Sequence, residues 1–478
     1  MDTASIQFVL FGLTVALVSN LSRSRAWRSV VLMVASILFL GLLAQDFRVF
    51  LPLAGFLLVG YVGLVLIQRG WSKATVWSIL AVLLVYTWLK KYSLFPHAVF
   101  LLHPYFTLGL SYILFRSLHL LIEAGDGDEK RSVGPGAYLL YTLNFTTLVS
   151  GPIQRYDEFA QDQFAAEPLP LGPGVIALQV ERIIRGFFKV NVLAMVLHAV
   201  QEDCVTQMAQ QFPVSIRILA AFKLVVVYPF FLYANFSGYI DIVIALARIM
   251  RLRLPENFDR PFSATSFLDF WNRWHITLST WLKTYVYNPL MMALMRRISS
   301  QAVQPLLGVI CFFITFFLIG IWHGRTSEFA FYGVLLGAGA AINKFWQLGI
   351  TAKFKKKGYK ALAANPIYIS SSRGLTFSWF ALSLFWFWAD WKQIGTLFRA
   401  IGGLEWLGVW LLVWFSATAF LAAWEVLRTQ LLSIRTAEGP VFTSRYARVV
   451  YASALALAAL TLTILLNQAA PDIVYKAF

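Results

Sequence analysis

Charged residues are scarce in this sequence: 13% of its 478 residues are Asp, Glu, Lys or Arg, about half the proportion typical of soluble domains. Cysteine is scarcer still, and Cys204 and Cys311 are too few and too far apart to form a disulfide framework or a zinc site. The sequence contains no phosphate-binding glycine loop, internal repeat or low-complexity linker. These absences exclude a disulfide-stapled domain, a cysteine-based metal centre and a P-loop nucleotide site.

Long hydrophobic runs stand where charge is missing. Hydrophobic residues make up 59% of the chain, and a helix needs roughly 20 apolar residues to cross a bilayer. We expect about eleven true spans, with two or three further runs re-entrant or interfacial, because 98–122 and 174–200 contain charges. The first run is not expected to be a cleaved signal peptide, since no basic stretch precedes it and another span follows. The candidate runs are 5–20, 29–45, 48–68, 74–93, 98–122, 136–151, 174–200, 215–248, 303–323, 327–348, 374–391, 403–425 and 449–468.

The excess of basic residues follows the polar breaks between these runs. The net charge is +17, from 40 Lys and Arg against 23 Asp and Glu. Arg23, Arg25 and Arg28 form one basic loop, and "KFKKKGYK" at 353–360 forms another. Short basic loops are retained in the cytoplasm and attract anionic lipid headgroups. Membrane orientation therefore explains the charge without nucleic acid, with the N-terminus outside. The fold class expected is an all-α, polytopic integral membrane protein with one membrane-embedded domain, 1–478.

A tryptophan-rich segment between Pro255 and Pro289 has a different composition, "PENFDRPFSATSFLDFWNRWHITLSTWLKTYVYNP". We predict a helix beginning near Ser266, capped by Ser263 or Thr265. Helical spacing places Trp271, His275, Ser279 and Leu282 on one stripe, and Asp269 and Arg273 are four apart and can pair. Two interpretations remain open: an interfacial amphipathic helix with an aromatic belt, or a helix whose polar stripe lines a cavity inside the bundle.

A second histidine, His323, closes the apolar run "FFITFFLIGIWHG". An ionisable side chain at that depth is costly and is usually retained for function, although a histidine there can also simply reach the interface. His275 and His323 lie on different segments, which an adjacent span can bring to one cavity. A buried imidazole is neutral and can accept a proton from a hydroxyl. No Ser-His-Asp spacing is present, so we expect direct acyl transfer without a covalent enzyme intermediate.

These residues resemble the membrane-bound O-acyltransferase family, in the bacterial branch of alginate O-acetyltransferases and the D-alanyl transferase of lipoteichoic acid synthesis. The resemblance is carried by "NFDRPF", "FWNRWHITLSTW" and "WHG" in this order. Weaker similarity lies in "GLSYILFRSL" at 109–118, "SGPIQRYDEF" at 150–159 and "FWFWADW" at 385–391. The motif-bearing catalytic core is therefore expected to be 109–391.

The resemblance implies that His323 is catalytic and that His275 is a second histidine of the same site. It implies a ring of spans around a thinned centre, where a funnel lets a cytoplasmic thioester meet an acceptor hydroxyl from the other side. The donor would be acetyl-CoA or the phosphopantetheine arm of an acyl carrier protein, with no tightly bound cofactor and no metal. The setting would be a bacterial cytoplasmic (inner) membrane, with an extracytoplasmic acyltransferase as a further partner. The substrate-binding candidates are Trp322, Asn272, Ser279 and Trp271.

The acceptor and the acyl group stay open at this stage. The leading interpretation is transfer of an acetyl or D-alanyl group to an extracytoplasmic polysaccharide or cell-envelope polymer. Alternatives are transfer to a lipid or protein hydroxyl, or a transporter or flippase whose intramembrane His and Asp residues form a path. The absence of a second tryptophan-rich segment counts against a transporter. Asp241, a charge inside an apolar run, is expected to pair structurally with Arg248 or Arg251.

Overall fold

The computed structural model describes residues 5–44, 46–71, 73–101, 103–126, 132–298, 300, 302–436, 439–440, 444–466 and 471. Almost all of its regular structure is helical, as predicted; β1 (Arg435–Thr436) and β2 (Gly439–Pro440) form one short antiparallel pair. The chain divides into two compact units. The first is built from Met1–Phe187 and Phe236–Glu256, and the second from Phe188–Asn235 and Asn257–Pro471. Helix α11 (Val214–Ile249) contributes to both.

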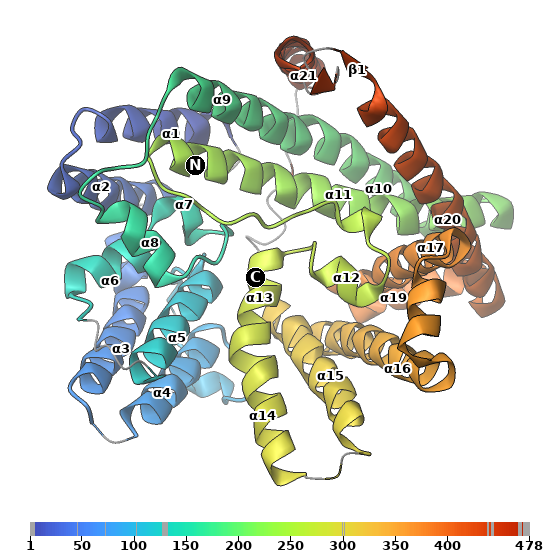
Figure 1. The fold of residues 1–478 in the computed structure, drawn as a ribbon, viewed down its shortest axis with the longest axis horizontal. Coiled ribbons are helices and arrows are strands. Elements are labelled where there is room, and N and C mark those ends of the chain that lie inside the picture. Colours follow the sequence, from blue (N-terminus) through green and yellow to red (C-terminus); the bar gives the residue numbers. More distant parts are fainter. Residues whose placement is uncertain are drawn as a thin grey trace. The chain divides into compact units, whose positions relative to one another are not determined.

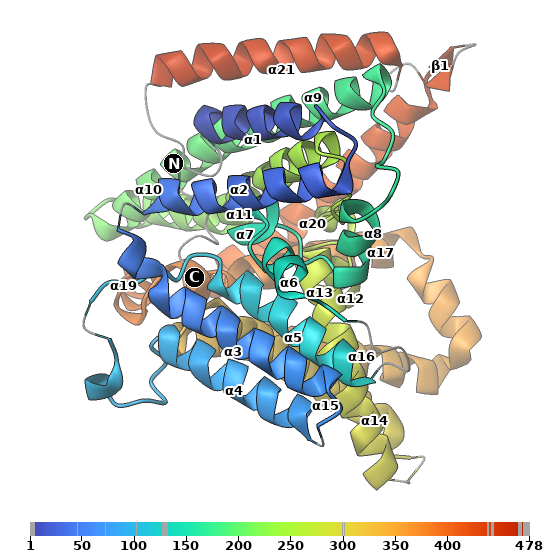
Figure 2. The ribbon, with the colours of Figure 1, turned by 90° about the vertical axis from the view of Figure 1, so that its left-hand side faces the viewer.

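The first unit is assembled from helices early in the chain, among which α3, α4 and α5 pack side by side (Figures 1 and 2). The predicted span at 136–151 is wrong, because the segment is broken into two short helices at Asn144, whose side chain accepts a hydrogen bond from the Thr146 N–H. The elements are α1 (Ile6–Ser19), α2 (Arg25–Leu43), η1 (Phe47–Phe50), α3 (Leu51–Gln68), α4 (Ala74–Leu89), η2 (His97–Val99), α5 (Leu110–Asp126), α6 (Pro135–Thr142), α7 (Phe145–Leu148), α8 (Tyr156–Gln163) and α9 (Pro173–Phe188).

The second unit contains the tryptophan-rich segment and the "WHG" motif. Its most extensive helix–helix packing is between α15 and α16, which form a helical hairpin (Figure 1). Its elements are the π-helical η3 (Lys189–Ala194), α10 (Met195–Ala209), η4 (Pro261–Ser263), α12 (Phe267–Trp271), α13 (Ile276–Leu282), the π-helical η5 (Lys283–Tyr287), α14 (Asn288–Arg297), α15 (Gln304–His323), α16 (Ser327–Ala363), α17 (Pro366–Ser383), α18 (Phe385–Trp388), α19 (Trp391–Ile401), α20 (Gly403–Ser433) and α21 (Arg445–Leu466).

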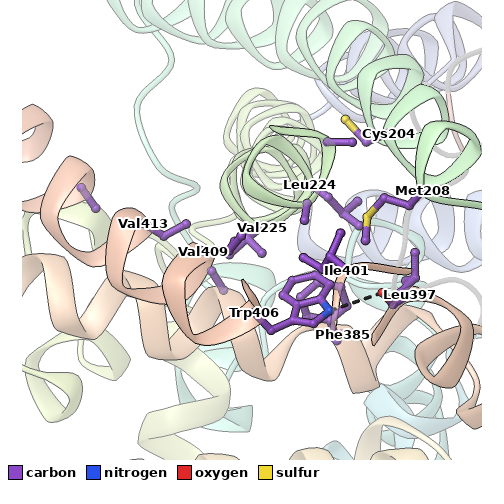
Figure 3. Close-up of a cluster of buried hydrophobic side chains, with 14 of the residues drawn as sticks. Cys204, Met208, Leu224, Val225, Phe385, Leu397, Ile401, Trp406, Val409 and Val413 are labelled. Carbon is purple, nitrogen blue, oxygen red and sulfur yellow. Dashed lines mark hydrogen bonds between the residues drawn. The ribbon is translucent and has the colours of Figure 1, made fainter. Parts of the chain in front are cut away.

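An apolar core holds several of these helices together. In it, Trp406 of α20 packs against Phe385 of α18 with ring centroids 5.5 Å apart. The Trp406 indole N–H donates to the Leu397 carbonyl at 3.3 Å (Figure 3), so the polar atom of this large ring is satisfied inside the core. Leu224 and Val225 extend the cluster to α11. The second unit thus has a continuous core of its own.

Seven of the described helical stretches are long and apolar enough to cross a membrane. They are Arg25–Leu43, Phe47–Gln68, Pro173–Ala209, Val214–Ile249, Gln304–His323, Gly403–Ser433 and Arg445–Leu465. Two shorter apolar helices, Ile6–Ser19 and Ala74–Leu89, match further predicted runs. The basic segment 353–360 is not a loop as expected: it is helical and belongs to α16, which kinks at Lys355, where φ is 61°.

The buried carboxylate of Asp241 has structural partners, although not those expected from the sequence. The Arg182 Nε donates to Asp241 at 2.9 Å, and Arg185 is a second partner. Arg248 and Arg251 instead donate to other groups, the Pro170 carbonyl and the Asn20 side chain. Arginines one helical turn apart on α9 therefore neutralise this charge within the first unit.

Candidate active site

The tryptophan-rich segment is not the single helix expected from its periodicity. It breaks between α12 and α13, and His275 lies at the break with a left-handed backbone, φ 45° and ψ 52°. The cap of α12 is Ser266 itself, which accepts the Asp269 N–H at 3.2 Å, while the Ser263 hydroxyl bonds to Glu425. The prediction that Trp271, His275, Ser279 and Leu282 share one stripe of a single helix is therefore wrong. The predicted Asp269–Arg273 pair is confirmed, at 3.0 Å.

His323 occupies the last position of α15 and is buried. Its imidazole is surrounded by aromatic rings from three elements. The ring centroid lies 4.7 Å from that of Trp322, 5.1 Å from Phe387 of α18 and 5.8 Å from Tyr332 of α16. These rings cover the imidazole, which is 2% exposed.

The structure brings both histidines to the Trp322 indole. The His275 ring is 6.3 Å from the Trp322 indole in an edge-to-face arrangement, and the same indole contacts His323. The two imidazoles are also close enough to interact electrostatically. His275 and His323 come from segments far apart in the sequence. Helix α12, which precedes His275, contacts α15 through the rings of Trp271 and Phe316, whose centroids are 5.3 Å apart.

Burial sets the charge of His275, which lies outside the seven candidate spans. Its side chain is 1% exposed. Burial lowers the pKa of His275 to about 3, because the imidazolium would lose its hydration. At neutral pH this imidazole is uncharged and has a ring nitrogen that can take up a proton.

A cavity of about 400 Å³ lies among α12, α13, η5, α15 and α16, and neither histidine is one of the residues that line it. Ser279, one helical turn after His275, and Ile319, one turn before His323, both line it. Two cations, Lys283 and Lys344, also line the wall. The cavity wall therefore carries two cations and the carboxylate of Asp269, and it includes one residue a helical turn from each histidine in the sequence.

The four predicted substrate-binding residues separate into two groups. Trp271, Asn272 and Ser279 line the cavity. The Ser279 hydroxyl donates to the Trp274 carbonyl at 3.4 Å, so it braces the turn that carries His275. Trp322 instead lies beside both imidazoles.

Gly320 and Gly324, on either side of Trp322 and His323 in the sequence, lie against neighbouring atoms and leave no room for a ligand. A side chain at Gly320 would meet the backbone of Gly333 in α16, and one at Gly324 would meet the Phe329 ring. Both glycines thus allow close helix packing rather than the approach of a thioester. Gly333 and Gly337 of α16 likewise allow close packing against α15.

Four further residues of the site were not predicted from the sequence. Lys344 and Gln347 lie mid-helix in α16, and Tyr332 and Phe387 face His323. Nothing in their local sequence distinguishes them from ordinary residues of a membrane helix. The weak similarity of "FWFWADW" was the single signal, since it contains Phe387.

The fold and the site indicate a helical membrane protein in which two buried histidines and a cavity lined in part by lysines lie in the second unit. A family model of the membrane-bound O-acyltransferases matches residues 126–386, more than half of the sequence, and the chain belongs to this family. The resemblance inferred from the motifs is therefore confirmed.

Curated proteins similar to this chain fall into two groups. The teichoic acid D-alanyltransferase of Streptococcus thermophilus is 32% identical over 266 residues, which cover 54% of this chain and 62% of that protein. That of Bacillus subtilis is 29% identical over 262 residues, with the same coverage of both chains. A probable alginate O-acetylase, AlgI, of Pseudomonas aeruginosa is 31% identical over 252 residues, or 53% of this chain and 45% of the relative. The chain spans less than two thirds of the length of each.

Proposed function

We propose that this protein transfers an acyl group from a thioester donor to a hydroxyl group, with His323 as the general base and His275 as a second histidine of the site. The observation that carries the proposal is that two buried imidazoles from different segments both lie beside the Trp322 indole. A neutral imidazole in a dry site is the group that proton abstraction from a hydroxyl requires.

In the proposed reaction, a ring nitrogen of His323 accepts the proton of the acceptor hydroxyl as its oxygen attacks the thioester carbonyl carbon. A new C–O bond forms and the C–S bond breaks. The departing thiolate takes the proton back from the imidazolium, so the products are an ester and a free thiol. No acyl-enzyme is needed, because the acceptor attacks the donor directly.

The cavity is the proposed place of the donor. Acetyl-CoA and an acyl carrier's phosphopantetheine share a long thioester arm that carries phosphate, and Lys283 and Lys344 supply positive charge for that phosphate. The donor is a substrate, so no tightly bound cofactor is required. An acyl carrier protein is the partner proposed on the cytoplasmic side.

The names of the relatives narrow the acyl group and the acceptor. They describe transfer of D-alanine to teichoic acid and of acetyl to alginate. We propose an acetyl or D-alanyl group and a hydroxyl of an extracytoplasmic polysaccharide or envelope polymer. The setting would be a bacterial inner membrane, with one membrane domain of about eleven spans around a funnel. An extracytoplasmic acyltransferase would be a further partner.

Replacing His323 tests the base. In purified, folded protein in nanodiscs, His323→Gln and His323→Ala should lower acyl transfer by about a hundred- to ten-thousandfold, because neither side chain takes a proton. Binding of the thioester donor should persist, since the imidazole is not needed to hold it. Near-normal turnover in His323→Gln would refute the base mechanism.

His198 supplies a matched control in the same unit, because it is 37% exposed and lies in α10. His198→Gln should leave transfer unchanged. His275→Ala should lower transfer at least about a hundredfold with little change in membrane protein level. Full activity in His275→Ala would mean that His275 only packs.

A further inference from the structure

Asn257 is a fully buried polar residue in the chain that follows α11. Its side chain contacts neither histidine ring in the hydrogen bonds of the structure, and it does not line the cavity. Its bonds go instead to the first residues of α13. The Ile276 N–H donates to the backbone carbonyl of Asn257 at 3.0 Å. The Thr277 N–H and hydroxyl both donate to Asn257 Oδ1, at 3.1 and 2.6 Å.

These bonds make Asn257 the cap of a helix that is not its neighbour in the sequence. The first N–H groups of a helix have no partner inside it, and the N-cap side chain usually accepts one of them. His275 holds the N-cap position of α13, but its side chain makes no cap hydrogen bond. Asn257 takes over this task with its side-chain oxygen.

The backbone of His275 needs such support. A left-handed conformation is unfavourable for residues other than glycine and persists where the surroundings enforce it. The bonds to Ile276 and Thr277 fix the chain directly after His275. Directly before it, Trp274 pairs with Phe258, and the Asp259 N–H donates to the Arg273 carbonyl at 3.0 Å.

We infer that Asn257 is a positioning residue of this enzyme: it holds His275 in its left-handed backbone and so aims the imidazole at Trp322 and His323. The inference rests on the proposed function. Asn257 touches no reacting atom, and its effect on the reaction passes through His275. A misplacement of about 1 Å in a catalytic group can cost about a hundredfold in rate.

Asn257→Ala removes the acceptor for Thr277 and should lower kcat by about ten- to a hundredfold while the KM for the donor stays near wild type, because the cavity lining is unchanged. Asn257→Asp keeps an oxygen in the same place and should restore most of kcat. The second readout needs no activity: diethyl pyrocarbonate labelling mapped to His275 by peptide mass spectrometry should rise in Asn257→Ala. Buried in the wild type, this ring should label slowly.

Asn365 supplies the matched control. It caps α17, and its side chain accepts the N–H groups of Ile367 and Tyr368 at 2.9 and 3.2 Å, but it is exposed. Asn365→Ala also removes an asparagine cap, and should change neither kcat nor the labelling of His275. Equal losses of kcat in Asn257→Ala and Asn365→Ala would mean that any lost cap slows the enzyme, which contradicts a positioning role.

Thr277→Val keeps the proposal testable if Asn257→Ala does not accumulate. It removes the hydroxyl bond to Asn257 and retains shape and the backbone bond, so a few-fold loss of kcat and faster His275 labelling are expected. Unchanged kcat and unchanged labelling in the folded variants would overturn the inference. Wild-type protein that transfers no acyl group would sink the proposed function alone, since the labelling of His275 still reports its positioning.

Discussion

At the scale of single residues, burial and backbone geometry act together on His275. The side chain is 1% exposed and its pKa is lowered to about 3 by the loss of hydration. In the unfolded chain the same imidazole titrates near 6.5. The two states therefore bind different numbers of protons between these pH values, which links the stability of the protein to pH.

The sign of this linkage gives a testable prediction. Between pH 6.5 and about 3 the unfolded state binds a proton at His275 that the folded state does not, so stability is complete above pH 6.5 and falls as pH falls. The slope from this one group is about 1.4 kcal/mol per pH unit. The Tm of wild type in detergent should therefore fall more steeply from pH 6.5 to 5 than that of His275→Gln, which cannot titrate.

The comparison uses slopes, because His275→Gln can also change the stability at pH 7 by altering packing. His198→Gln again serves as the control, since its ring is 37% exposed; its Tm should follow the wild-type curve. Parallel Tm curves for wild type and His275→Gln over this range would contradict a neutral, buried His275.

At the scale of elements, the α15–α16 hairpin depends on glycines that let two backbones approach. A Cβ on Gly337 would lie 2.8 Å from the Phe313 carbonyl oxygen and 2.9 Å from the Phe313 ring. Such contacts are closer than side chains tolerate, so the helices would have to separate. His323 is carried by one of these helices and contacts Tyr332 of the other, so their separation would also disturb the site.

We therefore predict that Gly337→Ala destabilises the protein by about 1–3 kcal/mol, the usual cost of overpacking. Gly349 lies in the same helix, and a Cβ on it would have no neighbouring atom within 4 Å. Gly349→Ala should therefore be neutral or stabilising by about 0.5–1 kcal/mol, the gain of alanine over glycine in a helix. Thermal unfolding of both variants in detergent checks this. An equal Tm change in the two would contradict the close packing.

Hydropathy predicted the long spans well because a span can be recognised from the composition of its own residues alone. Helices α11, α15, α20 and α21 all fall on predicted apolar runs. Breaks within apolar or amphipathic segments could not be predicted in the same way. The run 136–151 is interrupted where Asn144 caps α7. The segment after Ser266 is interrupted at His275, where the cap is Asn257, a residue too distant for any local pattern to reveal.

The candidate site shows the same division. Its histidines were predicted from the free-energy cost of placing an imidazole in an apolar run and from the resemblance of the motifs to the family. Their meeting at Trp322 depends on tertiary packing, and so does the cavity beside them. Lys344 was missed because a lysine in a membrane helix has the same sequence signature whether it faces a cavity or the interface.

At the scale of the whole molecule, the proposed reaction requires a defined orientation in the membrane. The proposed donor is cytoplasmic, and the basic segment 353–360 is expected to face the same side. This segment ends α16, whose first residues follow His323. The helix runs from Ser327 to its kink at Lys355, roughly 40 Å at 1.5 Å per residue, which matches the thickness of a bilayer. It is not among the seven described stretches that are also apolar enough to span a membrane.

The first residues of α19 lie beside the first residues of α16. There the Trp391 N–H donates to Glu328 at 3.0 Å and the Trp391 indole to Ser327 at 2.8 Å. Lys392, the next residue, is exposed, as is Lys356 near the kink. Lys392 of α19 therefore lies beside the start of α16, and Lys356 lies near the kink of α16, which makes them a matched pair for a labelling experiment.

We predict that a membrane-impermeant thiol reagent labels Lys392→Cys in intact spheroplasts but labels Lys356→Cys only after permeabilisation, because short basic segments resist translocation. The native Cys204 and Cys311 are both buried, so each introduced cysteine can be read against a low background. The parent protein without an introduced cysteine is the control, and transfer activity shows that each variant is folded. The reverse pattern, with Lys356→Cys labelled first, would place the basic end outside. The cation-lined cavity would then need a donor from outside the cell, where neither CoA nor a carrier protein supplies one.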